Sequence, residues 1–223
     1  MIIEKIKEFA VECHVADVEL FIDKMQQLYA NLKEVNSVTN LTRITSEEEF
    51  WVKHVADSLA IVKFYPELAK ENLKILDIGC GAGFPSLVLA TAFENLEITS
   101  LDSIEKKIKF VAETAKILGL KNLTAIAGRG RELNRKDEYR NNFDIITGRA
   151  VADARKLYRE TKAMPKNETG RFIFYKTPEQ LKVDFVQVSK DSAKAGFIWK
   201  TTEVFELPNN GGERQFLEGF IVE

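Results

Sequence analysis

A short apolar run that ends in a cluster of glycines is the feature that most constrains how this chain can fold. Residues 73–78 have the composition of a buried strand, and they lead directly into Asp77-Ile78-Gly79-Cys80-Gly81-Ala82-Gly83. Glycine reaches backbone angles that other residues rarely adopt, and it lets a ligand approach the main chain without meeting a Cβ atom. In parallel α/β sheets, ligands bind at the carboxyl ends of the strands. The sequence therefore predicts a ligand site directly after residue 78.

Strand-like and helix-like segments alternate after residue 72. Short apolar runs predict strands, and segments with apolar residues at helical spacing predict helices. The expected strands are 73–78, 96–102, 123–127, 143–147 and 171–176, with two closing β segments near 197–206 and 214–222. The expected helices are 85–92, 104–118, 151–162 and one that begins at Pro178. This alternation predicts a doubly wound α/β fold with a largely parallel sheet.

The first 72 residues predict helices alone. Apolar residues recur at helical spacing up to Val35, and Asn36-Ser37-Val38-Thr39-Asn40 then interrupts the pattern with turn-forming residues. Ser46, which precedes three glutamates, has the pattern of an N-cap for a further helix that ends before Pro66. We therefore expect residues 1–72 to form an N-terminal helical extension, packed on one α/β domain of residues 73–223.

The spacing of the glycines distinguishes between two classes of cofactor. The turn reads G-x-G-x-G and lacks the third glycine of the dinucleotide pattern G-x-G-x-x-G, which places a pyrophosphate on a helix N-terminus. Asp102 ends the second expected strand, 23 residues beyond Gly79, where a carboxylate accepts hydrogen bonds from ribose hydroxyls in such folds. Together these features predict S-adenosylmethionine as the cofactor, and hence a class I methyltransferase.

Composition and charge limit the remaining possibilities. The sequence has no run of about 18 apolar residues and no signal-peptide pattern, so a cytoplasmic protein without a membrane span is expected. Two cysteines and two histidines predict neither a disulfide framework nor a metal site. The net charge is −2, but residues 102–159 carry 14 Lys+Arg against 8 Asp+Glu, whereas residues 1–72 carry 8 against 13. A basic segment can hold a polyanion on one face, although scattered solvated charge is an equally good interpretation of the count.

Several short motifs give the chain a specific resemblance. It resembles the ribosomal RNA small subunit methyltransferase G family (RsmG, also called glucose-inhibited division protein B) over about residues 35–176. One further motif of the family lies near the C-terminus. The motifs are Asn40-Leu41-Thr42, His54-Val55-Ala56-Asp57-Ser58, the glycine turn with Phe84-Pro85, Leu101-Asp102-Ser103, Lys106-Lys107, Gly128-Arg129, Arg149-Ala150, Lys176 and Gly212-Glu213-Arg214.

The resemblance implies a Rossmann-like sheet, mostly parallel with an antiparallel C-terminal strand. It also implies methylation of N7 of a single guanine, guanine 527, in 16S ribosomal RNA. The partner would be the free RNA or a small ribosomal subunit particle, and the protein would act as a monomer. The implied cofactor-binding residues are Gly79, Gly81, Phe84, Asp102, Gly130, Arg131 and Arg149; the implied RNA-facing residues are Arg129, Arg149, Lys176 and Arg214.

The chain departs from the family pattern at three positions. Ser86 and Thr177 stand where the family usually has glycine, and Arg131 stands where it favours an acid. The last substitution puts a side-chain role of Arg131 in doubt, although a backbone contact would survive.

The chemistry of guanine N7 agrees with the residues present. N7 carries a lone pair and no proton, so its methylation needs alignment of the reactants rather than a general base. Exocyclic amine methylation generally brings prolines after the fourth strand, but residues 143–150 contain none. Pyrimidine C5 methylation needs a thiolate, and neither Cys13 nor Cys80 is suitably placed. Ribose methylation usually requires a lysine and acid set that we do not identify in the sequence.

The sequence predicts different roles for individual side chains. No catalytic residue is certain, but Arg149 at the end of the fourth strand is the candidate, because a guanidinium binds phosphate or stacks on a base. His54 and Asp57 share a helical face and are expected to tie the extension to the domain. Asn40 is expected to be a turn former and Cys80 a small filler. A methyltransferase for small molecules or proteins, and a non-catalytic RNA- or nucleotide-binding module, remain as alternatives.

Overall fold

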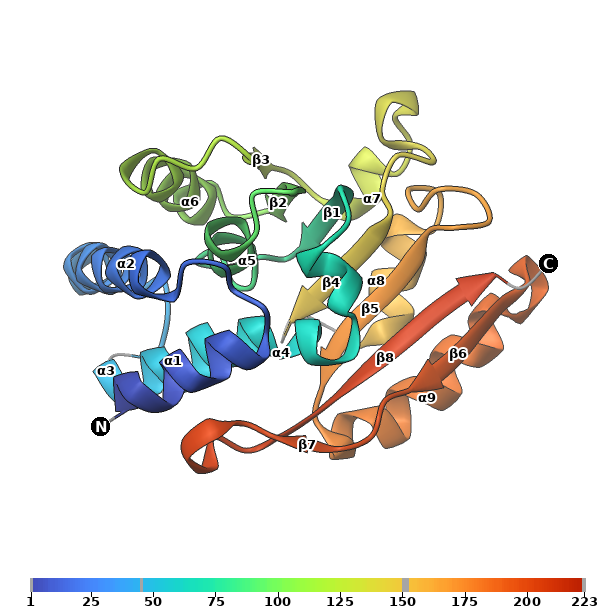
Figure 1. The fold of residues 1–223 in the computed structure, drawn as a ribbon. Helices are drawn as coiled ribbons and strands as arrows, with labels where there is room; N and C mark the ends of the chain where they lie inside the picture. Colours follow the sequence, from blue (N-terminus) through green and yellow to red (C-terminus); the bar gives the residue numbers. More distant parts are fainter. Residues whose placement is uncertain (1, 45, 150–152, 222–223) are drawn as a thin grey trace.

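The computed structural model describes residues 2–44, 46–149 and 153–221, and the strands in them form one sheet (Figure 1). The strand order is β3-β2-β1-β4-β5-β8-β6, and β7 pairs with β8 outside this path. The strands are β1 (Leu73–Ile78), β2 (Leu96–Asp102), β3 (Leu123–Ala127), β4 (Ile145–Arg149), β5 (Arg171–Lys176), β6 (Phe197–Thr201), β7 (Phe205–Glu206) and β8 (Glu213–Ile221).

The direction of the strands matches the expected mixed sheet. Strands β1 to β5 are parallel to one another, and β8 runs antiparallel to both β5 and β6. The chain passes from β1 outward through β2 and β3 and then returns to place β4 on the other side of β1. Because strand order reverses at β1 and β4, a ligand-binding crevice is expected outside their carboxyl ends.

The sequence located most strand boundaries well, with two corrections. The β segment expected near 197–206 is divided into β6 and β7, which residues 202–204 separate. Strands β1, β2, β3 and β5 begin and end where their apolar runs do. The expectation of a strand at 143–147 was wrong by two residues, because Gly148 and Arg149 pair with Phe174 and Tyr175 of β5. Phe143 instead forms an isolated bridge with Pro165. Glycine is a weak strand former, so the pairing with β5 rather than local propensity extends β4 through Gly148 to Arg149.

Helices cover both faces of the sheet. On one face lie α5 (Ser86–Ala92) and α6 (Glu105–Ile117), together with the N-terminal helices; on the other lie α8 (Ala154–Thr161) and α9 (Pro178–Ser192), with the short α7 (Gly130–Leu133) next to α8 (Figure 1). Two clusters of buried apolar side chains follow this division. Short 3₁₀ turns occupy η2 (Pro66–Ala69), η3 (Asp137–Tyr139), η4 (Ala193–Ala195) and η5 (Pro208–Asn210).

The N-terminal segment is helical, as expected, but its second helix is longer. It contains α1 (Ile2–Glu12) and α2 (Val18–Thr39), so the expected interruption at 36–40 was wrong for all but its last residue. Asn40 ends α2 in the left-handed conformation, which asparagine tolerates. The side chain of Asn36, although still in the helix, accepts a hydrogen bond from the Thr42 amide and donates one to the Thr42 carbonyl. Helix α2 therefore fixes the segment that follows it.

The helix expected after Ser46 contains an irregular stretch. Ser46 caps α3 (Glu47–Glu49), the chain continues through the π-helical η1 (Phe50–Ala56), and α4 (Asp57–Phe64) ends before Pro66. A π-helical turn is wider than an α-helical one and is often found at functional sites. The core cluster on this face includes residues on both sides of residue 72, and the domain boundary expected there stays a prediction.

The last helices follow the expected pattern where they are described. Helix α8 begins at Ala154, and residues 151 and 152 of the expected helix lie outside the described residues. Thr177 caps α9 in a capping box with Gln180, which stands three residues into the helix. None of the helices in the described ranges is both long and apolar enough to cross a membrane.

Candidate active site

Three clefts adjoin one another along the carboxyl ends of the strands. The glycine-turn cleft, of about 340 Å³, lies between the glycine turn and the segment after α2. The β2–β3 cleft, of about 430 Å³, shares Gly79 and Asp102 with it. The β5–β8 cleft, of about 300 Å³, shares His54 and Arg149 with the glycine-turn cleft. The glycine-turn cleft therefore joins the other two.

The glycine turn has the backbone shape that the sequence predicted. Gly79, Gly81 and Gly83 all have positive φ, and a Cβ atom on Gly81 would project into open space. The amides of Gly79 and Cys80 both donate to the Leu101 carbonyl, at 2.6 and 3.1 Å, which ties the turn to β2. The main chain is thus held firmly and left uncovered where a ligand can approach it.

Asp102 is fixed by two backbone amides. One of its carboxylate oxygens accepts from the Gly81 amide at 3.0 Å, and the other accepts from the Ile104 amide at 2.9 Å. The side chain lines both the glycine-turn cleft and the β2–β3 cleft. Each carboxylate oxygen has a second lone pair, so this geometry leaves acceptors for the ribose hydroxyls of S-adenosylmethionine. The uncovered glycine turn and Asp102 together fit this cofactor.

Asp77, at the end of β1, is a second carboxylate below the turn. It is buried, and one of its oxygens accepts hydrogen bonds from both the hydroxyl and the amide of Ser86. Its other oxygen has no hydrogen-bond partner among the described residues. Burial raises the pKa of Asp77 to about 6, although the bonds from Ser86 and the nearby charge of Arg149 lower it. Ser86, which replaces the usual glycine of the family pattern, therefore stabilises the charged form of Asp77.

Arg149 lies between the glycine-turn cleft and the β5–β8 cleft. Its guanidinium donates to the Lys53 carbonyl at 2.9 Å, to Asp57 at 3.1 Å and to Nδ1 of His54 at 3.2 Å. The guanidinium carbon also lies 5.7 Å from the centre of the Phe84 ring. The candidate catalytic residue is therefore held by three groups of the N-terminal segment and one aromatic ring of the cofactor turn.

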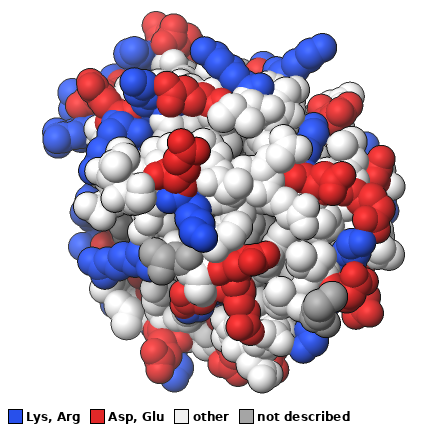
Figure 2. Space-filling view, turned by 90° about the vertical axis from the view of Figure 1, so that its left-hand side faces the viewer, with Lys and Arg blue, Asp and Glu red and all other residues white. Residues whose placement is uncertain are grey.

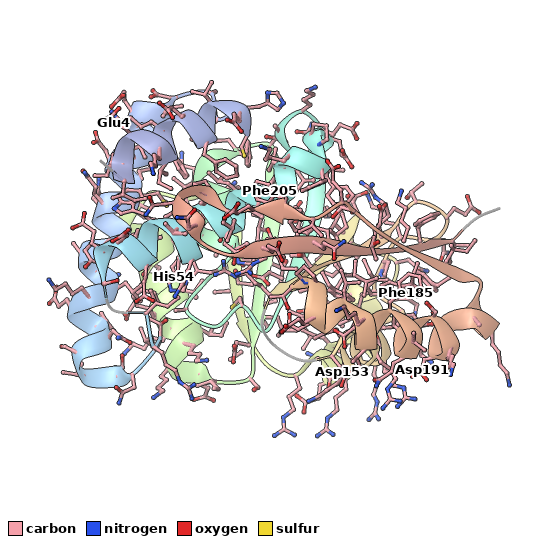
Figure 3. All side chains as sticks on the ribbon, turned by 90° about the horizontal axis from the view of Figure 1, so that it is seen from below. Glu4, His54, Asp153, Phe185, Asp191 and Phe205 are labelled. Carbon is pink, nitrogen blue, oxygen red and sulfur yellow. The ribbon has the colours of Figure 1, made fainter. Side chains whose placement is uncertain are left out.

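His54 is neutral and has a defined tautomer. Burial and the adjacent charge of Arg149 lower its pKa to about 2. Because an arginine only donates, Nδ1 must accept, and Nε2 carries the proton and faces the Thr42 hydroxyl at 3.4 Å. The ring stacks on Phe84, with 3.9 Å between the ring centres (Figure 3 labels His54). The ring of His54 therefore packs between the extension and the cofactor turn. Because Nδ1 already accepts a hydrogen bond from Arg149, it is not free to act as a general base.

Asp57 connects the extension to two strands. It accepts from Arg149, and it accepts from Arg214 through both of its oxygens, at 2.7 and 3.0 Å. Its side chain is only 3% exposed. The expected tying role of His54 and Asp57 thus agrees with their contacts, and these contacts reach Arg149 and Arg214, a connection that the sequence did not reveal.

The other predicted site residues also line the clefts. Gly130, Arg131 and Arg129 line the β2–β3 cleft, whereas Lys176 and Arg214 line the β5–β8 cleft. Lys176 is buried, and its ammonium lies 2.6 Å from the Asp184 carboxylate, so an RNA phosphate would share it with that acid. The binding roles expected of all these residues stay predictions.

The chain is similar to known proteins over most of its length. The family model described as "rRNA small subunit methyltransferase G" matches residues 21–210. The chain is 36% identical to the ribosomal RNA small subunit methyltransferase G of Limosilactobacillus reuteri, over 90% of this chain and 84% of that protein. It is 39% identical to the protein of the same name from Staphylococcus saprophyticus, over 87% of this chain and 81% of that protein. The chain belongs to this family.

Solved structures agree on the fold. A SAM-dependent methyltransferase from Aquifex aeolicus superimposes with a TM-score of 0.57 at 18% identity, over 86% of this chain and 98% of that chain. A SAM-dependent O-methyltransferase from Thermotoga maritima has the same TM-score and identity, over 86% of this chain and 72% of that chain. The chain thus has the class I methyltransferase fold, and S-adenosylmethionine is the cofactor of this class.

The departures from the family pattern have local explanations at two of three positions. Ser86 binds Asp77, and Thr177 caps α9, so each hydroxyl has a hydrogen-bonding role that glycine would lack. Arg131 is exposed at the β2–β3 cleft, and nothing in the structure explains its replacement of an acid.

Two further expectations concern thiols and metals. Burial raises the pKa of Cys13 to about 12 and that of Cys80 well above its usual range, so neither is a thiolate near neutral pH. This supports the argument against pyrimidine C5 chemistry. Within residues 2–44, 46–149 and 153–221, no group of three His, Cys, Asp or Glu side chains is placed to hold a metal ion.

Proposed function

We propose that this protein transfers a methyl group from S-adenosylmethionine to N7 of guanine 527 in 16S ribosomal RNA. The observation that carries the proposal is the pair of clefts that meet at His54 and Arg149. One is bounded by the glycine turn and Asp102, and the other by basic side chains, with no free general base among the described residues that line it. A cofactor in the first and a guanine in the second would meet at Arg149.

The cofactor supplies an electrophilic methyl group on a sulfonium when it is bound. For this cofactor we propose Gly79, Gly81 and Phe84 as contacts in the glycine-turn cleft, and Asp102, Gly130 and Arg131 as contacts toward the β2–β3 cleft. Arg149 would contact both reactants, because it lines both clefts in which they would lie. The protein's task is then to align the reactants and exclude water.

The β5–β8 cleft suits a ring nitrogen without a proton. His54 is neutral and its Nδ1 is already bonded, and Lys176 is paired with Asp184. Neither group is free to remove a proton from a substrate. Arginine binds the O6 and N7 edge of guanine well, and N7 must stay open to attack, so we propose that Arg149 or Arg214 binds O6.

We propose that the RNA backbone follows the surface of α7 and α8. Exposed basic side chains there border the β2–β3 cleft and continue along α8; they are Arg129, Arg131, Lys156, Arg159 and Lys162. Seen from below, several nitrogen-tipped side chains project into solvent beside Asp153 and Asp191 (Figure 3). By contrast, the face on the side of α2 and α6 mixes both signs of charge (Figure 2). A phosphate backbone favours the first arrangement.

We also propose that the protein is a monomer that acts in the cytoplasm without a metal ion. Light scattering at assay concentrations tests the first point, and activity after treatment with a chelator tests the last.

The substrate is tested by mapping 7-methylguanosine. Borohydride and aniline cleave RNA at this base, so 16S ribosomal RNA and small-subunit particles incubated with protein and S-adenosylmethionine should be cut at guanine 527 only. Calorimetry with S-adenosylmethionine and with NAD tests the cofactor separately. Tight binding of NAD without binding of S-adenosylmethionine, or transfer of methyl groups to small molecules alone, would overturn the proposal.

A further inference from the structure

We propose that Asp57 is a positioning residue of the methyl transfer, which fixes Arg149 and Arg214 at the β5–β8 cleft and lowers the positive charge there. A guanine bound in that cleft can then become cationic at lower cost. The inference rests on the proposed function, since it assigns a role to Asp57 in the transfer to guanine N7.

The geometry gives Asp57 control over both guanidiniums. Arg149 ends β4, Arg214 lies in β8, and β5 runs between them in the sheet. The Asp57 carboxylate, at the first residue of α4, accepts from both across this gap. A carboxylate that accepts two bonds from one arginine fixes its plane as well as its position. Beside it, the hydroxyl of Tyr175 in β5 donates to the Ser58 carbonyl at 2.8 Å, so α4 is anchored to all three strands.

The reaction moves a positive charge toward this cluster. The lone pair of guanine N7 forms the new bond to the methyl carbon, while the carbon–sulfur bond breaks and its electron pair stays on sulfur. No proton leaves N7, so the charge lost by the sulfonium appears on the guanine. Asp57 lines the β5–β8 cleft but not the glycine-turn cleft, and it is therefore on the side that gains charge. The Asp57 carboxylate is itself buried, and a fixed, buried carboxylate beside the reacting base stabilises such developing charge.

The formal charge of the three side chains determines what the loss of Asp57 should do to the reaction. Arg149, Arg214 and Asp57 together carry +1, which still attracts an anionic RNA. Without the carboxylate the cluster would carry +2, and the cationic guanine would face two unopposed guanidiniums. Loss of Asp57 is therefore expected to slow the chemical step without weakening the attraction for RNA. A purely structural carboxylate would affect stability and binding together.

Glu218 in β8 provides a matched control. Its side chain is 4% exposed, and it also binds an arginine, Arg171, at 3.4 Å. It lies outside the three clefts. Asp57→Asn and Glu218→Gln each remove one buried carboxylate charge at nearly constant shape, so a difference between them reports the place of the charge.

The experiment compares both variants with the unmodified protein on small-subunit RNA. We expect Asp57→Asn to lower kcat at least tenfold, with KM for RNA unchanged or lower and Kd for S-adenosylmethionine within threefold by calorimetry. Glu218→Gln should lower Tm and leave kcat and KM unchanged. A kcat of Asp57→Asn equal to that of the unmodified protein would overturn the inference. So would a loss of kcat matched by an equal loss of affinity for S-adenosylmethionine.

A second pair of variants tests the charge directly and serves if Asp57→Asn alone does not fold. The cluster charge is 0 in Arg214→Gln, +1 in Asp57→Asn/Arg214→Gln and +2 in Asp57→Asn. At saturating RNA, the double variant should have a lower kcat than Arg214→Gln, because both lack Arg214 and differ only in the charge of Asp57. A double variant at least as active as Arg214→Gln would contradict the role of Asp57. If the unmodified protein produces no 7-methylguanosine, the proposed function fails and the inference with it; if only the variants behave otherwise than expected, the inference alone fails.

Discussion

Two networks of arginines and buried carboxylates lie toward opposite ends of the same strands, and they differ in charge balance. At the carboxyl ends, Asp57 binds Arg149 and Arg214, so two cations share one carboxylate. Arg171, the first residue of β5, binds Glu67 and Glu218, and Lys200 also binds Glu218, so two cations share two carboxylates. The balanced network needs no further partner, whereas the unbalanced one keeps a positive charge beside a cleft. The same residue types thus form a network without net charge at one end of the strands. At the other end they form a network with a net positive charge, which attracts anions.

The largest effects are expected when the central arginine of each network is replaced. Arg149→Ala should lower kcat/KM by at least about 100-fold, or about 2.7 kcal/mol, because it removes the group that borders both proposed reactants. Arg171→Ala should instead lower the free energy of unfolding by about 3 kcal/mol, because it leaves buried Glu218 with fewer partners. Methyl transfer assays and urea unfolding of both variants measure the two effects. Full activity of Arg149→Ala would refute the comparison.

A smaller effect is expected at the carboxylate below the glycine turn. Ser86→Ala removes the hydroxyl that binds Asp77, and it should lower the free energy of unfolding by about 2 kcal/mol, as for hydrogen bonds to charged groups. Ser100→Ala is the control, because the buried Ser100 hydroxyl has no hydrogen-bond partner among the described residues. That variant should lose no free energy of unfolding, because it removes a buried hydroxyl that makes no hydrogen bond to the described residues. Equal losses in urea unfolding would show that the bond to Asp77 is not the cause.

The neutral histidine beside Arg149 predicts a dependence on pH. The pKa of His54 is about 2 in the folded protein and about 6.5 when it is unfolded, so only the unfolded chain takes up this proton as pH falls below about 6.5. The folded protein therefore loses stability on acidification through this group. His54→Gln removes the effect. Between pH 7 and 5.5, the unfolding free energy of the unmodified protein should fall by about 1 kcal/mol more than that of the variant. Parallel pH profiles in urea unfolding would mean that His54 is not buried as a neutral ring.

The smallest expected effect concerns exposed cations that belong to neither network. Lys156→Gln with Lys162→Gln on α8 should weaken RNA binding a few-fold and reduce the slope of log Kd against log salt by about 2, because each lysine is expected to neutralise one phosphate. Lys109→Gln with Lys116→Gln on α6 changes the net charge equally and serves as the control. Filter binding at several salt concentrations measures both. Equal slopes for the two pairs would show that the RNA does not follow α8.

Local signals made much of the fold predictable. The glycine turn, Asp102 and the boundaries of β1, β2, β3 and β5 depend on residues close together in the sequence, and the structure agrees with them. The C-terminal boundary of β4 was missed because hydrogen bonds to β5, rather than its own residues, extend it. The π-helical stretch and the added length of α2 were missed because their sequences fit an ordinary helix or turn equally well.

The candidate site was predictable in membership but not in arrangement. The sequence identified Arg149, Arg214 and Lys176 as basic residues near strand ends, and it expected His54 and Asp57 to tie the extension to the domain. That Asp57 binds Arg149 and Arg214, 92 and 157 residues away, depends on how α4 packs across β4, β5 and β8. No periodicity or short motif carries such a pairing.

The sequence by itself determined the kind of ligand turn, the parallel α/β fold and the position of most strand ends, because these follow from backbone preferences and periodicity within a few residues. Only the tertiary structure decided which cations are neutralised and which remain as net charge. Lys176 is paired with Asp184, whereas Arg149 and Arg214 share Asp57. The physical reason is that the charge of a site is the sum over groups brought together from distant parts of the chain, and burial determines how strongly these groups interact.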